Sequence, residues 1–286
     1  MCAVGSGPQD LECRVVPTTT PEATLDAVIP FFRARSGLAA IGIGSFGPID
    51  LHPGSPAYGH ITATPKRAWR NFDLAGAVRR ALQLPAGFDT DVNAAALGEA
   101  RWGAGQGIGD FLYITVGTGI GGGALVNGRP LHGLQHPEMG HIRVPHDWAA
   151  DPFPGVCPYH GDCLEGLASG PAIEARWRAA PDSLPPDHPA WELEAHYLAL
   201  GLMNWLAVLS PRRIVMGGGV MRQSRLFPLV RRKLQQQWNR YVPCRELLEE
   251  IDSYIVPPRL GERAGVLGAL VLAEAAASAG SPRTAV

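Results

Sequence analysis

The sequence has few lysines, few charged residues and no apolar run long enough to span a bilayer. Of its 25 Lys and Arg residues only Lys66 and Lys233 are lysines, and charged residues make up 18% of the chain. The formal net charge is −1, so no basic surface for nucleic acid is indicated. The most apolar stretch, residues 198–209, is too short for a transmembrane helix and is typical of a buried one. We therefore expect neither a nucleic-acid partner nor a membrane.

Cysteine is also scarce. The chain has an odd number of cysteines, and no basic segment followed by an apolar run precedes them. This combination predicts reduced thiols in a cytoplasmic protein, or metal ligands, rather than a disulfide framework. The five are Cys2, Cys13, Cys157, Cys163 and Cys244.

Strand-like and helix-like segments alternate along the 286 residues. This alternation predicts an α/β fold with a boundary near residues 103–109. Strands are predicted at 2–5, 11–17, 38–44, 86–91, 111–116, 124–126 and 213–216. Helices are predicted at 21–35, 73–82, 93–102, 191–209, 226–241 and 263–277.

Two apolar strands run directly into glycine-rich turns. Residues 114–123 read Ile-Thr-Val-Gly-Thr-Gly-Ile-Gly-Gly-Gly, and residues 214–219 read Ile-Val-Met-Gly-Gly-Gly. Backbone N–H groups without neighbouring Cβ atoms can approach a phosphate closely, and Thr118 adds a hydroxyl donor. The second turn suits a nucleotide base or ribose passing over the backbone. Each turn alone could equally be a structural hairpin or a strand-to-helix connection.

A carboxylate stands at the C-terminal end of the predicted strand at 86–91. Residues 88–94 read Phe-Asp-Thr-Asp-Val-Asn-Ala, and ligands of α/β folds bind at such strand ends. Asp91 could accept a proton from an attacking hydroxyl. The alternative is that Asp91 or Asn93 caps the following helix.

A compact Cys-x-x-His-x-x-Cys motif carries the sharpest signal. Cys157, His160 and Cys163 form the motif, and His141 can complete a tetrahedron of two thiolates and two imidazoles. Such ligands favour zinc, and four of them leave no open position, so the site would be structural. The alternative is two free cysteines and two solvated histidines.

Taken together and in this order, these elements resemble the ROK family of bacterial sugar kinases and repressors, most closely its zinc-containing fructokinases. The resemblance covers nearly the whole chain, from Cys2 to about Ala277. The stretches that carry it are 42–50, 64–69, 89–99, 114–123, 136–141, 157–173 and 214–221.

The resemblance implies an actin-like (ribonuclease H-like) fold of two α/β lobes with ATP and sugar in the cleft. A small lobe at 1–108 would be completed by the helix at 262–286, and a large lobe at 109–261 would hold the zinc loop. Asp91 would take the proton from the 6-hydroxyl of fructose as its oxygen attacks the γ-phosphate of ATP. Mg²⁺ would bridge the nucleotide phosphates.

The resemblance also implies roles for further residues. Sugar contacts would come from Thr90, Glu138, His141 and Glu165, with Asp89 assisting. Nucleotide and phosphate contacts would come from Gly117, Thr118, Gly119, Pro171, Gly217, Gly218 and Gly219. The zinc would brace the sugar-binding loop, and relatives of this kind are often homodimers.

One feature of the family pattern is not found. ROK kinases open with a strand and an Asp/Glu-x-Gly-Gly-Thr turn for the ATP phosphates, and no such turn stands in this sequence. By resemblance that strand would lie between the strands at 2–5 and 38–44. We therefore expect the small lobe to be loose and ATP binding to be weak in the polypeptide as written.

Other classes of function remain open at this point. A ROK-type repressor would need a helix-turn-helix, and an inactive sugar- or zinc-binding remnant would bind without turnover. Among enzymes, a glucose, mannose or N-acetylhexosamine kinase is the alternative to a fructokinase. By resemblance, the Gly-Ser-Phe-Gly-Pro-Ile-Asp stretch and the Thr64-Pro65-Lys66 loop favour fructose.

Overall fold

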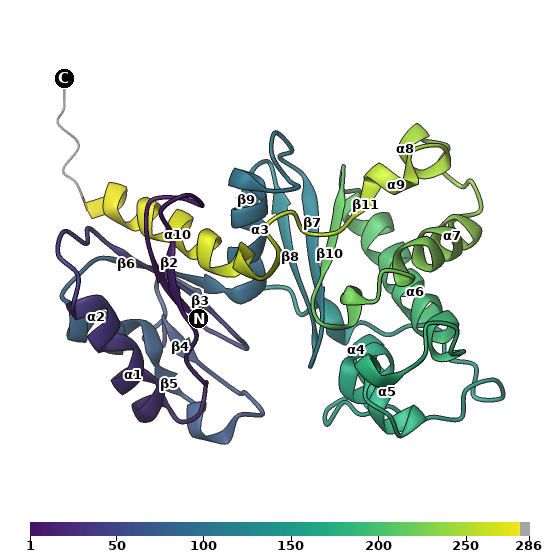
Figure 1. Cartoon of the computed structure of the whole chain (residues 1–286), viewed down its shortest axis with the longest axis horizontal. Helices are drawn as coiled ribbons and strands as arrows, with labels where there is room; N and C mark the ends of the chain where they lie inside the picture. Colours follow the sequence, from purple (N-terminus) through teal and green to yellow (C-terminus); the bar gives the residue numbers. More distant parts are fainter. Residues whose placement is uncertain (281–286) are drawn as a thin grey trace. The chain divides into compact units, whose positions relative to one another are not determined.

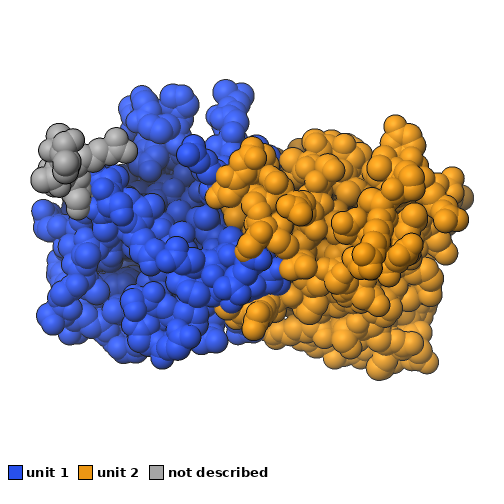
Figure 2. Space-filling view, turned by 90° about the horizontal axis from the view of Figure 1, so that it is seen from above, with its two compact units in different colours: residues 1–106, 129–137, 262–286 blue, residues 107–128, 138–261 orange. Residues whose placement is uncertain are grey.

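The computed structural model describes residues 1–280, which form two compact α/β units (Figure 2). Unit 1 is built from three stretches of chain, 1–106, 129–137 and the C-terminal stretch from 262. Unit 2 comprises residues 107–128 and 138–261. Residues 129–137, which the predicted division at 108 places in the large lobe, therefore pack with unit 1.

Unit 1 contains short strands and four longer helices (Figure 1). Strands β1 and β2 form an antiparallel hairpin, β3 and β6 pair in parallel, and β4 and β5 pair antiparallel. The strands are β1 (Cys2–Val4), β2 (Glu12–Arg14), β3 (Ile41–Ser45), β4 (His60–Ile61), β5 (Phe72–Asp73), β6 (Ala86–Thr90) and β9 (Arg129–Pro130). The helices are α1 (Pro21–Arg33), η1 (Arg67–Trp69), α2 (Leu74–Leu82), α3 (Asp91–Trp102) and α10 (Ala264–Gly280).

Helix α10 packs closely on the pair β3–β6 and on α3. A Cβ at Gly42 of β3 would lie 1.6 Å from the carbonyl oxygen of Ala269, and one at Gly268 would lie 1.5 Å from that of Ala94. Only glycine permits such approaches between backbones. The C-terminal helix is thus part of the core of unit 1.

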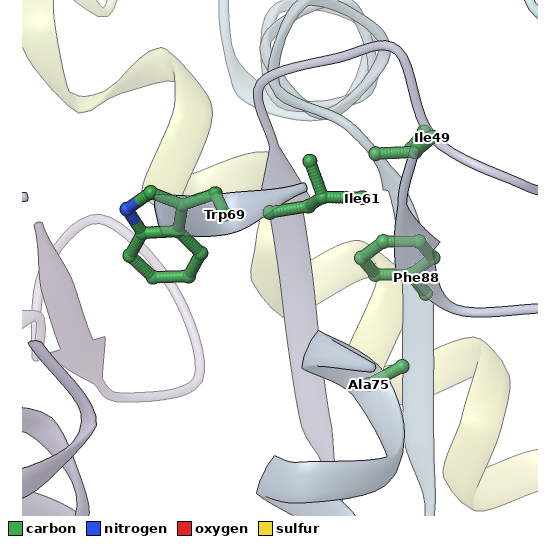
Figure 3. Packing of buried hydrophobic residues seen from close by; sticks show 5 residues of the cluster. All are labelled: Ile49, Ile61, Trp69, Ala75 and Phe88. Atoms are coloured by element: carbon green, nitrogen blue, oxygen red, sulfur yellow. The ribbon is translucent and has the colours of Figure 1, made fainter. Parts of the chain in front are cut away.

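A second core of unit 1 lies on the face of β6 that carries Phe88. Figure 3 shows Phe88 packed with Ile49, Ile61, Trp69 and Ala75, all less than a tenth exposed. This cluster fixes the loops that surround the end of β6.

A cavity of about 440 Å³ separates β1 from β3. It is lined by residues of both strands and by small residues of α10, among them Ala269, Ala273 and Ala277. Strands β1 and β3 belong to different sheets within the described residues. The cavity therefore lies where the resemblance placed a further strand.

In unit 2 the strands lie in the order β11-β10-β7-β8. β10 runs parallel to both β7 and β11, and β8 is antiparallel to β7. The strands are β7 (Phe111–Val116), β8 (Ile120–Val126), β10 (Ile214–Gly217) and β11 (Ile255–Val256). The helices are η2 (Met139–His141), α4 (Leu164–Ala168), α5 (Gly170–Trp177), η3 (Pro181–Ser183), α6 (Ala190–Leu209), η4 (Val220–Arg222), α7 (Leu226–Trp238), α8 (Arg245–Leu248) and α9 (Ile251–Tyr254), and η5 (Gly261–Arg263) follows them.

Helix α6 contains the apolar stretch at 198–209. It buries large side chains such as Trp191, Tyr197 and Leu198, as predicted for a core helix. Within residues 1–280 no helix is both long and apolar enough to cross a membrane.

Candidate active site and metal centre

Asp91 stands where β6 ends and α3 begins. The strand ends at Thr90 and the helix starts at Asp91, two residues earlier than predicted. The buried Thr90 is the N-cap, because its hydroxyl accepts the N–H of Asn93 at 3.1 Å. The capping role considered for Asp91 or Asn93 therefore belongs to Thr90. A carboxylate in the first helical turn is also favoured by the helix dipole.

The carboxyl of Asp91 has a raised pKa. Loss of water around it raises the pKa above the ordinary value, while the Val92 N–H at 2.8 Å and the charge of Lys66 oppose the rise. Asp91 nonetheless keeps an exposed surface. A carboxylate with these properties is a competent proton acceptor for a hydroxyl that reaches it.

The turn after β10 passes directly over the end of β7 in unit 2. Gly217 pairs with Thr115 in the parallel register. Gly218 has a φ of +94°, and a Cβ there would lie 2.3 Å from the carbonyl oxygen of Val116. Both the dihedral angle and the close approach require glycine. The exposed Gly219 follows before the η4 turn.

The turn between β7 and β8 adjoins the start of α5. The N–H of Gly117 donates to the carbonyl of Gly119 at 2.8 Å, and the carbonyl of Gly117 accepts the N–H of Gly170 at 2.7 Å. Thr118 and Pro171 are both exposed beside this contact. Unit 2 therefore brings the predicted phosphate- and nucleotide-binding residues of separate segments together.

The remaining glycines of this motif lie in a strand, although the sequence pattern predicted them in the turn. Gly121–Gly123 belong to β8. A Cβ at Gly122 would lie 2.4 Å from the sulfur of Met139, and one at Gly140 would lie 1.9 Å from the carbonyl oxygen of Ile120. The glycines thus allow η2 to pack flat on β8.

This packing places three predicted sugar-binding residues beside one another in unit 2. Glu165 accepts the N–H of Ile120 at 2.9 Å, and its other oxygen lies 3.9 Å from Nε2 of His141. The carbonyl of Glu138 accepts the N–H of His141 at 3.0 Å. The fourth predicted sugar ligand, Thr90, is in unit 1.

The four predicted metal ligands form one cluster in unit 2. The ligand atoms of His141, Cys157, His160 and Cys163 all lie within 4.8 Å of one another. The Cys157 sulfur lies 3.7 Å from Nδ1 of His141 and 3.6 Å from Nδ1 of His160. Tetrahedral zinc with bonds of about 2.3 Å to sulfur and about 2.0 Å to nitrogen requires S–N separations of about 3.5 Å. The residues therefore fit Zn²⁺.

The chemistry of the cysteines agrees with a metal centre. Cys157 and Cys163 are buried free thiols. Burial raises the pKa of Cys163 to about 11, and the neighbouring Cys157 adds to this rise. A bound cation would supply the positive charge that stabilises the thiolates. Because His141 presents Nδ1 to the thiols and Nε2 toward Glu165, the centre is coupled to a predicted sugar ligand.

A hydrogen-bond network that no sequence pattern predicted supports the metal loop. Asp162, inside the Cys-x-x-His-x-x-Cys motif, pairs with Arg143 and lies 3.3 Å from Nδ1 of His146. His146 in turn contacts the carbonyl of Asp151, whose carboxylate accepts the Tyr197 hydroxyl at 2.6 Å. The abundance of His and Asp between 131 and 164 was the available signal, but pairing across 16 to 46 residues is not a sequence property.

Comparison with known proteins identifies the family. The ROK family pattern matches residues 1–276. A Bacillus subtilis relative, itself provisionally described as a fructokinase, is 49% identical over 98% of this chain and 93% of its own length. The fructokinase of Zymomonas mobilis is 46% identical over 91% of this chain and 88% of its own length. This chain belongs to the ROK family.

A solved structure gives the same result for the fold. The ROK family glucokinase of Streptomyces griseus, crystallised with glucose and AMPPNP, is 25% identical with a TM-score of 0.73. The match covers 95% of this chain and 97% of the glucokinase. The predictions of ROK membership and of an actin-like α/β fold are confirmed.

Proposed function

We propose that this chain is an ATP-dependent fructokinase that makes fructose 6-phosphate from D-fructose. The carrying observation is Asp91, an exposed carboxylate at the junction of β6 and α3. The identity of 46% to the Zymomonas mobilis fructokinase supports fructose as the hexose.

In the proposed reaction the 6-hydroxyl oxygen of fructose attacks the γ-phosphorus of ATP. Asp91 accepts the hydroxyl proton, a new O–P bond forms, and ADP departs with the electron pair of the broken bond. Thr90, Glu138, His141 and Glu165 orient the sugar. Phosphoryl transfer depends mainly on positioning and on neutralising charge, so these contacts matter as much as the base.

The nucleotide is assigned to the adjoining turns of unit 2. Gly117, Thr118 and Gly119 would hold phosphate through backbone N–H groups and one hydroxyl. Gly217, Gly218, Gly219 and Pro171 would contact the rest of the nucleotide. Mg²⁺ would neutralise the nucleotide phosphates when bound.

The metal cluster is assigned to structural zinc. Four protein ligands fill a tetrahedral site, so the ion would brace the segment of Glu138 and His141 without taking part in chemistry. We further propose that the enzyme acts in the cytoplasm, where its free cysteines stay reduced, and that it works as a homodimer.

The test is a coupled assay that follows ADP release with different sugars. We expect the highest kcat/KM with fructose and lower values with mannose, glucose and N-acetylglucosamine. A clear preference for glucose would assign the chain to the activity named for the Streptomyces griseus structure. Binding of sugar or zinc without ADP release would instead support an inactive remnant.

A further inference from the structure

Asp89 is a buried carboxylate whose oxygens are fully engaged within unit 1. It is 3% exposed. One oxygen accepts the N–H of Thr90 and the side-chain amide of Asn93, both at 2.7 Å. The other lies 3.0 Å from Nε2 of His132. With these donors around it, Asp89 is placed to organise its neighbours rather than to accept a proton from a substrate.

His132 is the hydrogen-bond partner of this buried carboxylate across the chain. The hydrogen bond to Asp89 raises the pKa of His132, although partial burial opposes the rise. Since Asp89 can only accept, Nε2 of His132 must carry a proton in this contact. The contact joins residues 43 positions apart, and a carboxylate buried without such a partner would be strongly disfavoured.

A second histidine, His136, holds the segment that contains His132. His136 is 7% exposed, and its Nε2 accepts the N–H of Ile49 at 3.0 Å. Burial lowers the pKa of His136, so this histidine stays neutral and keeps the lone pair that it needs. Residues 132–136 are therefore fixed both to the β6–α3 junction and to the loop after β3, immediately before the chain reaches Glu138.

We propose that His132 is a positioning residue of the kinase, acting through Asp89 and Asn93. Asn93 lies in the same first turn of α3 as Asp91, so the three-residue contact fixes the helix start that carries the base. It also fixes the segment leading into Glu138. The inference rests on the proposed function, because it takes Asp91 as the base and Glu138 as a sugar ligand.

The test compares three variants of the full chain. His132→Leu removes the donor, and His132→Gln retains an N–H at nearly the position of Nε2. Leu134→Ala is the matched control, because Leu134 lies in the same segment and is 95% exposed. For His132→Leu we expect kcat/KM for fructose to fall roughly 10- to 100-fold, the range for a lost hydrogen bond to a charged group. The fructose KM should rise, because the contact supports the segment that leads into a proposed sugar ligand. The ATP KM should stay within about two-fold, because the contact includes no residue assigned to the nucleotide.

Two further variants, His132→Gln and Asp89→Asn, distinguish a positioning role of His132 from a purely structural one. His132→Gln should recover most of the lost kcat/KM, and adding His132→Leu to Asp89→Asn should cause little further loss. Equal loss in His132→Gln and His132→Leu, or an unchanged fructose KM in His132→Leu, would overturn the proposal.

A measurement independent of activity distinguishes failure of this inference from failure of the proposed function. Histidine NMR titration of the wild type should give a pKa for His132 above that in Asp89→Asn. If fructose is not phosphorylated but this difference is found, the contact stands and only the fructokinase assignment fails. If no difference is found, the Asp89–His132 contact is refuted.

Discussion

At the residue scale, the proposal depends on one carboxylate. Replacing Asp91 with Asn keeps the size of the side chain and removes its ability to accept a proton. We expect kcat to fall roughly 10²- to 10⁴-fold, the usual contribution of a general base. Thermal stability and metal content should stay near those of the wild type. The exposed Asp187→Asn serves as the control, and a kcat within about ten-fold of wild type would rule out Asp91 as the base.

The pH dependence of the reaction provides a second test of Asp91. The base must be ionised, so kcat/KM is lost as the pH falls through its pKa. Because loss of water raises this pKa, the acid limb of the profile should lie at a higher pH than an ordinary aspartate would give. Removing the opposing positive charge with Lys66→Met should move the limb to still higher pH. A limb that stays in place would show that another group controls it.

At the scale of elements, the metal loop should depend on its ion. Gly161, with a φ of +62°, closes the tight turn in which Cys157 and Gly161 exchange backbone hydrogen bonds. Elemental analysis should find about one zinc per chain, as a closed four-ligand site implies. Cys157→Ser should lose the metal and raise the fructose KM, because η2 links the metal ligand His141 directly to the preceding Glu138. The exposed Cys13→Ser is the control, and unchanged zinc in Cys157→Ser would refute the ligand set.

Helix α6 holds a buried carboxyl that serves no proposed step. Both oxygens of Glu194 lack a hydrogen-bond partner, and burial raises its pKa well above the ordinary value despite Arg176 nearby. The folded protein therefore binds this proton more tightly than the unfolded chain. The free energy of unfolding should fall as the pH rises from the unfolded pKa toward the folded one.

Glu194→Gln should remove this pH dependence. Thermal denaturation at several pH values should show a flatter profile and a Tm at pH 8 higher by several degrees. This estimate combines about 1.4 kcal/mol per unit of pKa difference, which the neutral amide does not incur, with roughly 2–4 °C per kcal/mol. The half-exposed Glu192→Gln on the same helix is the control. If both variants keep the wild-type slope, Glu194 does not titrate in this range.

At the scale of the whole molecule, unit 1 has a half-open pocket beside one edge of β3. The N–H of Ile41 bonds to Pro85 on the β6 side, so the alternate residues Gly42 and Gly44 direct their backbone groups toward the other edge of β3. Gly42 lines the cavity of about 440 Å³ beside β1. An unpaired edge of β3 and an unfilled pocket beside it should both lower the free energy of unfolding of unit 1.

An engineered strand should therefore stabilise unit 1. We expect a chain extended before Met1 by a strand of small apolar residues and a Gly-Gly-Thr turn to have a higher Tm and a lower ATP KM. The matched control carries proline at alternate positions of the added strand, because proline cannot donate to β3. An equal Tm for both extensions would show that the cavity does not accept a strand.

The amino-acid sequence by itself determined the class of fold and the chemistry of the candidate sites. Alternation of apolar strands and helices, the Cys-x-x-His-x-x-Cys spacing and the carboxylate after the strand at 86–90 are local patterns. Local patterns persist because backbone periodicity, capping and short-range ligand spacing depend on a few consecutive residues. Such patterns led to the α/β fold, to Asp91 and to the four metal ligands.

Only the tertiary structure decided what joins these segments. It placed Thr90 as the cap of α3, moved Gly121–Gly123 from the turn into β8, and brought His132 to Asp89 across 43 residues. It also left Glu194 buried without a partner. These features depend on which side chains compete for the same buried space and the same donors. The competing residues are far apart in the sequence, so a local pattern of residues cannot predict which contacts form.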